Sequence, residues 1–324
     1  MATYRLLTRL LPSRLKQTTQ RLIKKLLNTT DQNQSKFAID SRLLGDPHTL
    51  AWSNLGFWQA KNSQSDNHAP MDYITACENL AHVVGEAARL GSTDQLLDLG
   101  CGQGASLQYW NTAFSVKNIT AFELQTNCIE KIKQASLPQL KAIYQASFSQ
   151  LPLPAAHLYR AFDVVVCVDA AYHAPLADFL AVNQAALKPD GRMAFTSLIR
   201  PVNPKKSRFV LHHFKKYFNK EVLQLASIPP QHLCSEQDII KILNSFGFID
   251  IQIKHLNRPV LAGFAQYIQR QPPAMNRHNM NKHTLAAWLK ITLTAKLCGF
   301  LYQHQLVNYS VVSATYRPDI TSIP

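Results

Sequence analysis

Asp98-Leu99-Gly100-Cys101-Gly102-Gln103-Gly104-Ala105-Ser106 is the stretch of the chain that decides its fold. It continues from the apolar pair Leu96-Leu97, which predicts a short buried strand. Three glycines at every second position let the backbone turn tightly and approach a ligand closely. A helix that begins at about Ala105 would point its free N–H groups at an anionic group of that ligand. In a dinucleotide-binding fingerprint the third glycine would fall at residue 105, whereas here it is Gly104.

Strand-like and helix-like segments alternate from this loop onward. Strands separated by helix-length segments indicate a parallel sheet that is covered by helices on both faces. A helix with one apolar face is predicted before the first strand, from Ile74 to Ala88, and two long helical regions at 205–245 and 260–304. The turn at 188–191 is expected to lead into the fifth strand. The predicted strands cover residues 96–99, 119–122, 140–144, 162–168, 193–198, 248–253 and 308–316.

Two polar groups follow predicted strands at the edge where a parallel sheet binds ligands. Glu123 ends the second strand, about 20 residues after the glycines, where an acid accepts hydrogen bonds from the hydroxyls of a ribose. Asp169-Ala170-Ala171-Tyr172-His173 follows the fourth strand. Because the carboxyl ends of parallel strands lie over the ligand crevice, this segment is a candidate for catalysis.

Together these motifs resemble those of a class I S-adenosylmethionine-dependent methyltransferase. The resemblance rests on Asp-x-Gly-x-Gly-x-Gly, on the acid that ends the second strand, and on Leu187-Lys188-Pro189-Asp190-Gly191-Arg192, and it covers residues 54 to about 316. Three segments are similar to those of the small-molecule branch that includes erythromycin O-methyltransferases and tocopherol and sterol methyltransferases. These segments are Asn54-Leu55-Gly56-Phe57-Trp58, Asp169-x-x-Tyr172-His173 and residues 245–250.

The resemblance implies a Rossmann-like α/β fold: a doubly wound, seven-stranded sheet in the order 3-2-1-4-5-7-6, mostly parallel with one antiparallel strand, and with helical lid insertions. It implies S-adenosylmethionine as the cofactor, with the ribose held by Glu123. It further implies Ser147 and Phe148 on the adenine side, although the family usually has an Asp where this chain has Ser147. A hydroxyl accepts a hydrogen bond more weakly than a carboxylate does. The remaining implied cofactor-binding residues are Asp98, Gly100, Gly102, Gly104 and Asp169.

His173 is the candidate catalytic base, because an imidazole is poised near neutral pH and relatives that methylate sugar hydroxyls often carry a histidine there. The alternative is a histidine that caps a helix or packs. Trp58 and Tyr172 are candidates for the walls of the substrate pocket, and core packing is an equal alternative for Trp58.

Metal catalysis and nucleic-acid methylation find little support in the motifs. The histidines lack partners at metal-ligand spacing, so no metal site is predicted. The Asp-Asn pair of magnesium-dependent catechol-type enzymes and the Asn-Pro-Pro-Tyr motif of nucleic-acid and glutamine N-methyltransferases are missing from their expected positions. Six cysteines without a C-x-x-C pair favour a reduced, cytoplasmic setting.

The formal net charge of +14 is unevenly distributed along the 324 residues. Residues 91–200, which carry the motifs, have eight basic and eight acidic side chains, whereas residues 201–324 have fifteen basic and five acidic ones. The surplus therefore lies outside the predicted cofactor core, and a surface that clamps nucleic acid throughout is not indicated. No run of 18 apolar residues occurs, so no membrane-spanning helix is expected.

Residues 1–34 form a predicted basic amphipathic arm with leucines at helical spacing and no acid before Asp31. This pattern favours an anionic membrane surface, through residues 1–30, and a peripheral location at a membrane; packing on the protein and an organellar transit peptide are the alternatives. A second basic segment, 204–220, mixes six basic residues with aromatics. It is interpreted first as a lid, then as a surface for anionic lipid or substrate, and last as a nucleic-acid surface.

The sequence therefore predicts an arm at 1–34 and a methyltransferase domain at 35–324. Within the domain, the cofactor core covers about 92–200 and the helical substrate lid about 201–245 and 257–305. The predicted reaction is methyl transfer to a hydroxyl of a small lipophilic or glycosylated molecule. The alternatives are C- or N-methylation of a quinone-, sterol- or phospholipid-like acceptor at a membrane, and a cofactor-binding protein without turnover.

Overall fold

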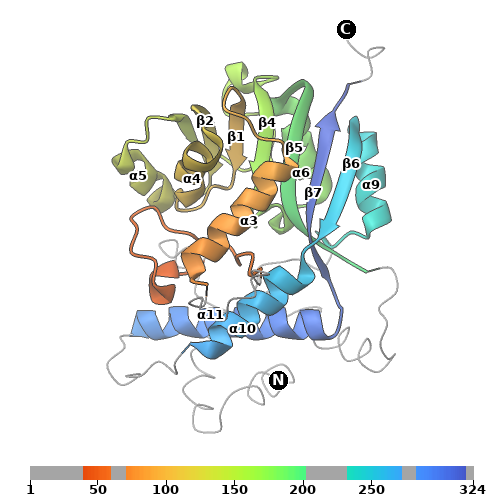
Figure 1. Ribbon diagram of the computed structural model, residues 1–324. Coiled ribbons are helices and arrows are strands. Elements are labelled where there is room, and N and C mark those ends of the chain that lie inside the picture. The colour runs from red at the N-terminus through yellow and green to blue at the C-terminus, as the bar shows by residue number, and fades with distance from the viewer. Residues whose placement is uncertain (1–38, 60–70, 202–231, 272–281, 319–324) are drawn as a thin grey trace.

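A seven-stranded sheet forms the centre of the computed structural model, which describes residues 39–59, 71–201, 232–271 and 282–318 (Figure 1). The N-terminal arm and most of the segment 201–245 lie outside these residues, as does the linker of the two C-terminal helices. The strands are β1 (Gln95–Leu99), β2 (Asn118–Glu123), β3 (Leu140–Gln145), β4 (Phe162–Cys167), β5 (Leu187–Ile199), β6 (Phe248–His255) and β7 (Asn308–Tyr316).

The helices connect and flank these strands, and short 3-10 turns lie between them. The α-helices are α3 (Tyr73–Ala87), α4 (Ala105–Phe114), α5 (Thr126–Ala135), α6 (Leu176–Ala186), α9 (Glu236–Ser245), α10 (Gly263–Arg270) and α11 (Lys282–Gln303). A π-helical turn, η6 (Arg258–Ala262), leads into α10. The 3-10 turns are η2 (Ser41–Leu44), η3 (Ala156–Leu158) and η4 (Ala171–His173).

The sheet has the predicted order, β3-β2-β1-β4-β5-β7-β6. Strands β1 to β5 pair in parallel, and β7 pairs antiparallel with both β5 and β6. The predicted turn at 188–191 is wrong in detail, because residues 187–192 are already part of β5. The register with β4 shifts there, between Phe162 and Val164, and Asp190 has a positive φ of 59°. The irregularity absorbs the turn residues without ending the strand.

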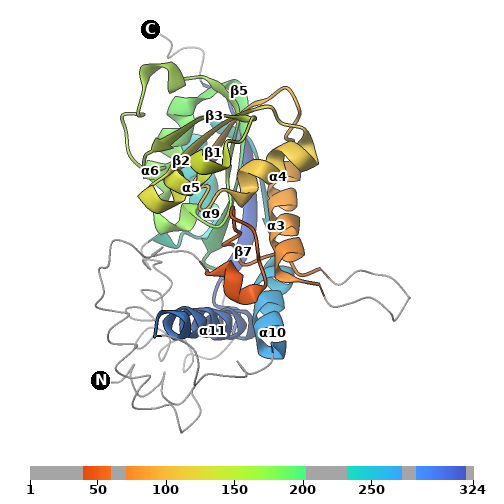
Figure 2. The same cartoon turned by 90° about the vertical axis from the view of Figure 1, so that its left-hand side faces the viewer.

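Two apolar clusters cover the two faces of the sheet. One face is packed by α3, α4 and α5, with Trp110 and Tyr73 fully buried, and the same apolar cluster continues into α10 and α11 below the sheet. The other is packed by α6 and α9, with Phe179 and Phe248 fully buried. Figure 2 shows α3 and α4 on one side of the strands and α6 and α9 on the other. This is the doubly wound arrangement that alternating strands and helices predict.

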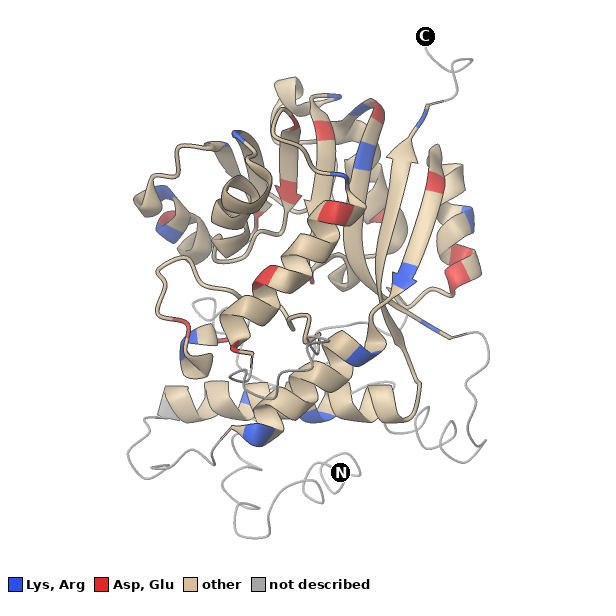
Figure 3. Ribbon diagram, in the orientation of Figure 1, with Lys and Arg blue, Asp and Glu red and all other residues tan. Residues whose placement is uncertain are grey.

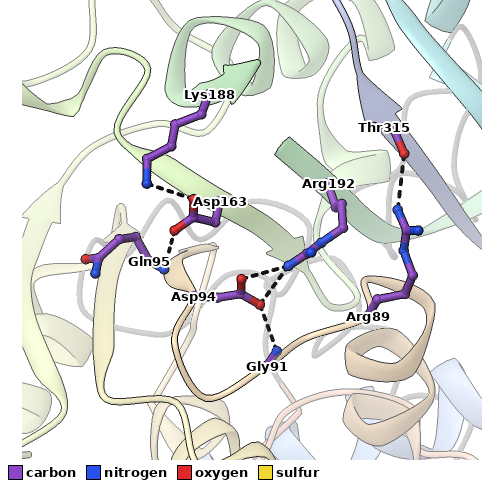
Figure 4. Close-up of polar contacts among 8 residues, drawn as sticks. All are labelled: Arg89, Gly91, Asp94, Gln95, Asp163, Lys188, Arg192 and Thr315. Carbon is purple, nitrogen blue, oxygen red and sulfur yellow. Dashed lines mark hydrogen bonds and ion pairs between the residues drawn. The ribbon is translucent and has the colours of Figure 1, made fainter. Parts of the chain in front are cut away.

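A polar network ties the strands together at the amino ends of β1, β4 and β5 (Figure 4). Arg192 donates from Nη2 to both carboxylate oxygens of Asp94, at 2.7 Å each, and Asp94 also accepts from the N–H of Gly91. Lys188 donates to Asp163 over 2.7 Å, and Asp163 accepts from the N–H of Gln95 as well. The network closes the end of the sheet that lies away from the glycine loop.

Helices α10 and α11 lie at the opposite end of the molecule, toward which β1 points in Figure 1. By length and composition, residues His283–Gln303 of α11 are long and apolar enough to cross a membrane. The sequence of this helix contains no run of 18 apolar residues, because Lys290, Lys296 and several threonines interrupt it. One such helix is weak evidence for a span, and α11 packs along α10 and η6.

Candidate active site

The glycine loop between β1 and α4 has the backbone that only glycine adopts easily. Gly100, Gly102 and Gly104 have φ angles of 75°, 58° and 90°. A Cβ atom on Gly104 would lie 2.6 Å from Cγ1 of Ile132, so this position also allows α5 to approach the loop. Helix α4 begins at Ala105, as predicted, and Gly104 caps it without a side-chain hydrogen bond. The first N–H groups of α4 are therefore free of any side-chain cap.

Asp98 anchors α4 to the end of β1. Its Oδ2 accepts hydrogen bonds from Oγ of Ser106, at 2.8 Å, and from the indole N–H of Trp110, at 2.7 Å. Burial raises the pKa of Asp98 to about 6, although these two hydrogen bonds act in the opposite direction. The site therefore holds a buried carboxylate whose charge is only partly compensated by its own neighbours.

Glu123 closes the glycine loop from the neighbouring strand. Its Oε2 accepts from the N–H of Gly102, and its Oε1 accepts from the N–H groups of Leu124 and Gln125, all at 2.9 Å. Burial raises the pKa of Glu123, and the three hydrogen bonds oppose that shift. Oε1 already accepts two donors, whereas Oε2 accepts one and has room for another. The ribose contact of Glu123 stays a prediction.

A small cavity opens between the glycine loop and the segment that precedes α3. Asp98 and the first residues of α4, Ala105 and Ser106, meet there. A carboxylate beside the uncapped start of a helix suits a ligand that carries both an ammonium and a carboxylate group. The amino-acid part of S-adenosylmethionine is such a group, so these residues fit the cofactor that the motifs imply. The cavity is lined by Ala51, Trp52, Ser53, Asn54, Asp98, Gly100, Cys101, Ala105, Ser106 and Val168.

The loop after β3 supplies an aromatic wall. The ring of Phe148 lies 3.3 Å from the place that a Cβ on Gly100 would occupy, and it packs edge-on against Phe179. Ser147 uses its hydroxyl within its own loop, where Oγ accepts from the N–H of Ser149 and forms a hydrogen bond with the Ser149 hydroxyl. Phe148 is thus next to the glycine loop, and the adenine contact of Ser147 stays a prediction.

Asp169 is the centre of a hydrogen-bonded network that the sequence does not reveal. Its Oδ1 accepts from the hydroxyls of Tyr172 and Tyr309, at 2.7 and 2.8 Å, and its Oδ2 accepts from the N–H of Leu55 at 2.7 Å. Its own N–H donates to Oγ1 of Thr196. Burial raises the pKa of Asp169, and the two tyrosine hydroxyls act against the shift. Asp169 therefore joins β4, β5, β7 and the segment before α3, and its contact with the cofactor remains a prediction.

His173 and Tyr172 lie on η4, immediately after β4 and Asp169. Their rings are 4.7 Å apart between centroids. Burial raises the pKa of Asp169, and His173 is close enough to oppose that shift. A second cavity borders η4, and His232 is one of its lining residues. Its Nδ1 is buried and has no hydrogen-bond partner among the described residues. That lining comprises Ala171, Tyr172, Ala174, Leu176, Phe195, Ser197, His232, Cys234 and Ile239.

Trp58 packs against the helical layer below the sheet. Its ring stacks on Tyr267 with a centroid distance of 4.3 Å, and its backbone N–H donates to the carbonyl of Pro259. A Cβ atom on Gly263 would lie only 2.3 Å from Cβ of Trp58. The packing alternative thus describes its contacts, while a contact with the acceptor stays a prediction.

Sequence reasoning missed Tyr309, Thr196 and His232. Tyr309 is 140 residues from Asp169 in the chain, and it is one aromatic residue in a β-branched strand, which gives no signal beyond core packing. His232 belongs to none of the motifs found in the sequence. Among the described residues, no group of three or more His, Cys, Asp and Glu side chains could hold a metal ion.

The segment that contains the glycine loop matches a known protein family. Residues 97–195, from β1 to the middle of β5, match the model of a methyltransferase domain. The chain carries a class I S-adenosylmethionine-dependent methyltransferase domain. The seven-stranded sheet in Figure 1 agrees with that assignment, and S-adenosylmethionine is the cofactor of this enzyme class.

The individual relatives are distant in sequence. The methyltransferase is 24% identical over 247 residues to erythromycin 3''-O-methyltransferase of Saccharopolyspora erythraea, covering 73% of this chain and 76% of that protein. Its fold is similar to that of a cyclopropane synthase from Mycobacterium tuberculosis, with a TM-score of 0.62 and 17% identity. The match covers 91% of this chain and 97% of the synthase chain.

Two further solved structures share the fold. Geranyl diphosphate C-methyltransferase from Streptomyces coelicolor A3(2) has a TM-score of 0.60 and 12% identity over 92% of this chain and 98% of the other. Phosphoethanolamine N-methyltransferase 2 of Haemonchus contortus has a TM-score of 0.57 and 15% identity over 74% of this chain. The match spans about half of that protein, 53% of its length. At these identities the structures establish the fold and leave the acceptor open.

Proposed function

We propose that the methyltransferase transfers a methyl group to a hydroxyl of a small lipophilic or glycosylated molecule. The observation that carries this proposal is the position of His173 on η4, directly after β4, next to the Asp169 network. The distant relation to an erythromycin O-methyltransferase supports a hydroxyl acceptor. We further propose that Asp98, the glycine loop and Glu123 hold the cofactor, with Phe148 as a wall.

The residues of the chain supply only part of the chemistry of methyl transfer. When bound, S-adenosylmethionine supplies a methyl group that its sulfonium already activates. The residues of the chain then have to align the acceptor and exclude water from the site. A ring nitrogen of His173 takes the proton of the acceptor hydroxyl, and the nearby Asp169 carboxylate stabilises the resulting imidazolium. Tyr172, fixed by its hydrogen bond to Asp169, forms one wall of the acceptor site.

The second cavity is where we place the acceptor. It shares Tyr172 and Ala174 with the segment around His173, and it adds the apolar side chains of Phe195 and Ile239. A buried imidazole nitrogen without a partner is unfavourable unless a ligand or water binds to it. His232 therefore offers a hydrogen bond to a polar group on an otherwise lipophilic acceptor.

Turnover with labelled S-adenosylmethionine tests the base. We expect His173→Ala to lower kcat about 100-fold or more while S-adenosylmethionine still binds. His173→Gln is the matched control for packing, because its side chain fills similar space without a basic group. Full turnover of both variants on the true acceptor would remove His173 from the mechanism.

Methylation of carbon or nitrogen is the second candidate, because the structural neighbours include a C- and an N-methyltransferase. Its acceptor would be a quinone-, sterol- or phospholipid-like molecule at a membrane. The position of the labelled methyl group in the product, read by NMR, separates these reactions. A cofactor-binding protein without turnover would bind S-adenosylmethionine and transfer no label to any component of an extract of its source cells.

Residues 1–30 supply a further part of the proposal, a cytoplasmic enzyme held at the surface of an anionic membrane. The leucines and the acid-free set of arginines and lysines in this arm support it. Vesicle sedimentation with the charges of Arg21, Lys24 and Lys25 reversed is the test. Unchanged partitioning into anionic vesicles would contradict a membrane role for the arm.

A further inference from the structure

The helical elements below the sheet, η6, α10 and α11, carry basic residues and no Asp or Glu. We define the α10–α11 face as η6, α10 and α11, residues 258–270 and 282–303. No Asp or Glu occurs anywhere between residues 251 and 318, a stretch that contains eight Lys and Arg residues. Figure 3 shows blue but no red on α10 and α11, whereas red residues are spread over the helices and strands above them.

Helix α11 adds an apolar surface to this charge pattern. The buried residues of the helix are Ile291, Leu293, Ala295, Leu297, Cys298 and Leu301. Only 28% of the most apolar 18-residue window is buried, however, and the mean hydropathy of that window is 1.3. Most of its side chains thus keep some accessible surface, which in a soluble environment is unfavourable for an apolar helix.

We propose that the α10–α11 face docks on the surface of an anionic lipid bilayer. A bilayer offers the two things that this face complements: an apolar interior for the accessible side of α11, and negatively charged headgroups for the bases around it. Arg258 and Arg270 mark the beginning of η6 and the end of α10, and both are exposed. They lie where headgroups would meet a helix pair that rests in the interface.

Other partners fit this face less well. A nucleic acid would favour exposed aromatic rings among the bases, and the exposed large apolar residue of this face is Tyr302 alone among the described residues. The face also lies at the carboxyl edge of the sheet, on the side of the cofactor cavity. Docking there would bring the carboxyl edge of the sheet, where the candidate catalytic residues lie, close to a membrane. The docking proposal does not depend on which acceptor is methylated.

Charge reversal in the full-length protein tests the proposal. The variant Arg258→Glu/Arg270→Glu is compared with Lys117→Glu/Lys141→Glu. The control bases are exposed and lie at the amino ends of β2 and β3, so the two variants change the net charge equally at opposite ends of the sheet. Partitioning is measured by sedimentation with vesicles of phosphatidylcholine alone and with about 30 mol% phosphatidylglycerol, a mixture that gives a negative surface.

We expect the α10 variant to bind anionic vesicles at least about 25-fold more weakly, since each basic residue near such a surface is worth about a fivefold change. The control is expected to change by less than about twofold, and high salt is expected to weaken the wild type. S-adenosylmethionine binding is measured on each variant to show that the fold is intact. Equal losses in the two variants would reduce the effect to net charge and overturn the proposal.

A second readout locates the contact. Trp288 on α11 is half-buried, so brominated lipids in anionic vesicles are expected to quench part of the tryptophan fluorescence, and Trp288→Phe is expected to remove that part. Quenching that persists unchanged in Trp288→Phe would contradict docking through α11. A loss of binding that follows only from reversing Arg21, Lys24 and Lys25 would assign membrane binding to the N-terminal arm instead and overturn the inference.

Discussion

At the scale of single residues, the three acids that we propose contact the cofactor also fix parts of the site to one another. Asp98 fixes α4, Glu123 fixes the glycine loop, and Asp169 fixes the segment before α3. Each accepts hydrogen bonds from groups of the chain, and burial raises the pKa of all three. Buried carboxylates of this kind lower the stability of the fold. They also provide hydrogen-bond acceptors that are already in place for donor groups on a ligand.

Asp98→Asn is expected to separate stability from cofactor binding. The amide oxygen can still accept from Ser106 and Trp110, while the buried charge is removed. Because the pKa of Asp98 is raised to about 6, its carboxylate disfavours folding at pH 7 by up to about 3 kcal/mol. The folded state takes up the proton before the unfolded state as the pH falls from about 6 to about 4, so the advantage of the variant should shrink over that range.

Urea unfolding at pH 7 and pH 4.5, together with titration of S-adenosylmethionine, measures both effects. We expect higher stability and weaker cofactor binding for the variant at pH 7. A variant that is less stable than wild type at pH 7 would show that the hydrogen bonds of Asp98 outweigh its desolvation.

At the scale of elements, the sequence predicted the sheet and the glycine loop because both depend on local patterns. Strand β1, the glycines and α4 are neighbours in the chain, and each obeys its own periodicity. The Asp169–Tyr309 hydrogen bond and the stacking of Trp58 on Tyr267 join residues that are far apart in sequence, and no local pattern encodes them. The detailed geometry at the start of β5 also escaped prediction, because a bulge lets proline and glycine remain within a strand.

Gly263 is the point at which α10 meets the segment before α3. A Cβ there would collide with Cβ of Trp58 at 2.3 Å, so Gly263→Ala is expected to lower the free energy of unfolding by about 1–3 kcal/mol. Gly91→Ala is the matched control, since its Cβ would meet nothing closer than Asp94 Oδ2 at 3.6 Å. Thermal unfolding of both variants is the measurement. Equal melting temperatures would mean that α10 and Trp58 are less tightly packed than the structure shows.

At the scale of the whole molecule, the two ends of the sheet differ in the residues that they carry. The amino end is closed by paired charges, and the carboxyl end carries the cavities, the catalytic candidates and the acid-free helices (Figures 3 and 4). Among the described residues, ion pairs tie the strands together at the amino end, and α10 and α11 at the other end carry basic residues without acids.

Lys188→Met tests the closed end. Burial of Asp163 acts to raise its pKa, but the hydrogen bond from Lys188 and the N–H of Gln95 lower it overall. A lowered carboxyl pKa contributes stability at neutral pH that is lost as the pH falls through that pKa. We therefore expect the variant to be less stable than wild type at pH 7 and to match it more closely at pH 3. A stability difference that is the same at both pH values would contradict this electrostatic role.

We propose that the loop between β1 and α4 holds S-adenosylmethionine with the help of Glu123. Calorimetric titration of the cofactor into the wild type, Glu123→Gln and Glu123→Ala is the test, with thermal unfolding to confirm that each variant is folded. Saturable binding to the wild type is predicted, with affinity at least about tenfold lower in both variants because a charged acceptor for hydroxyl donors is lost. No binding to the wild type, or the same affinity in all three proteins, would contradict it.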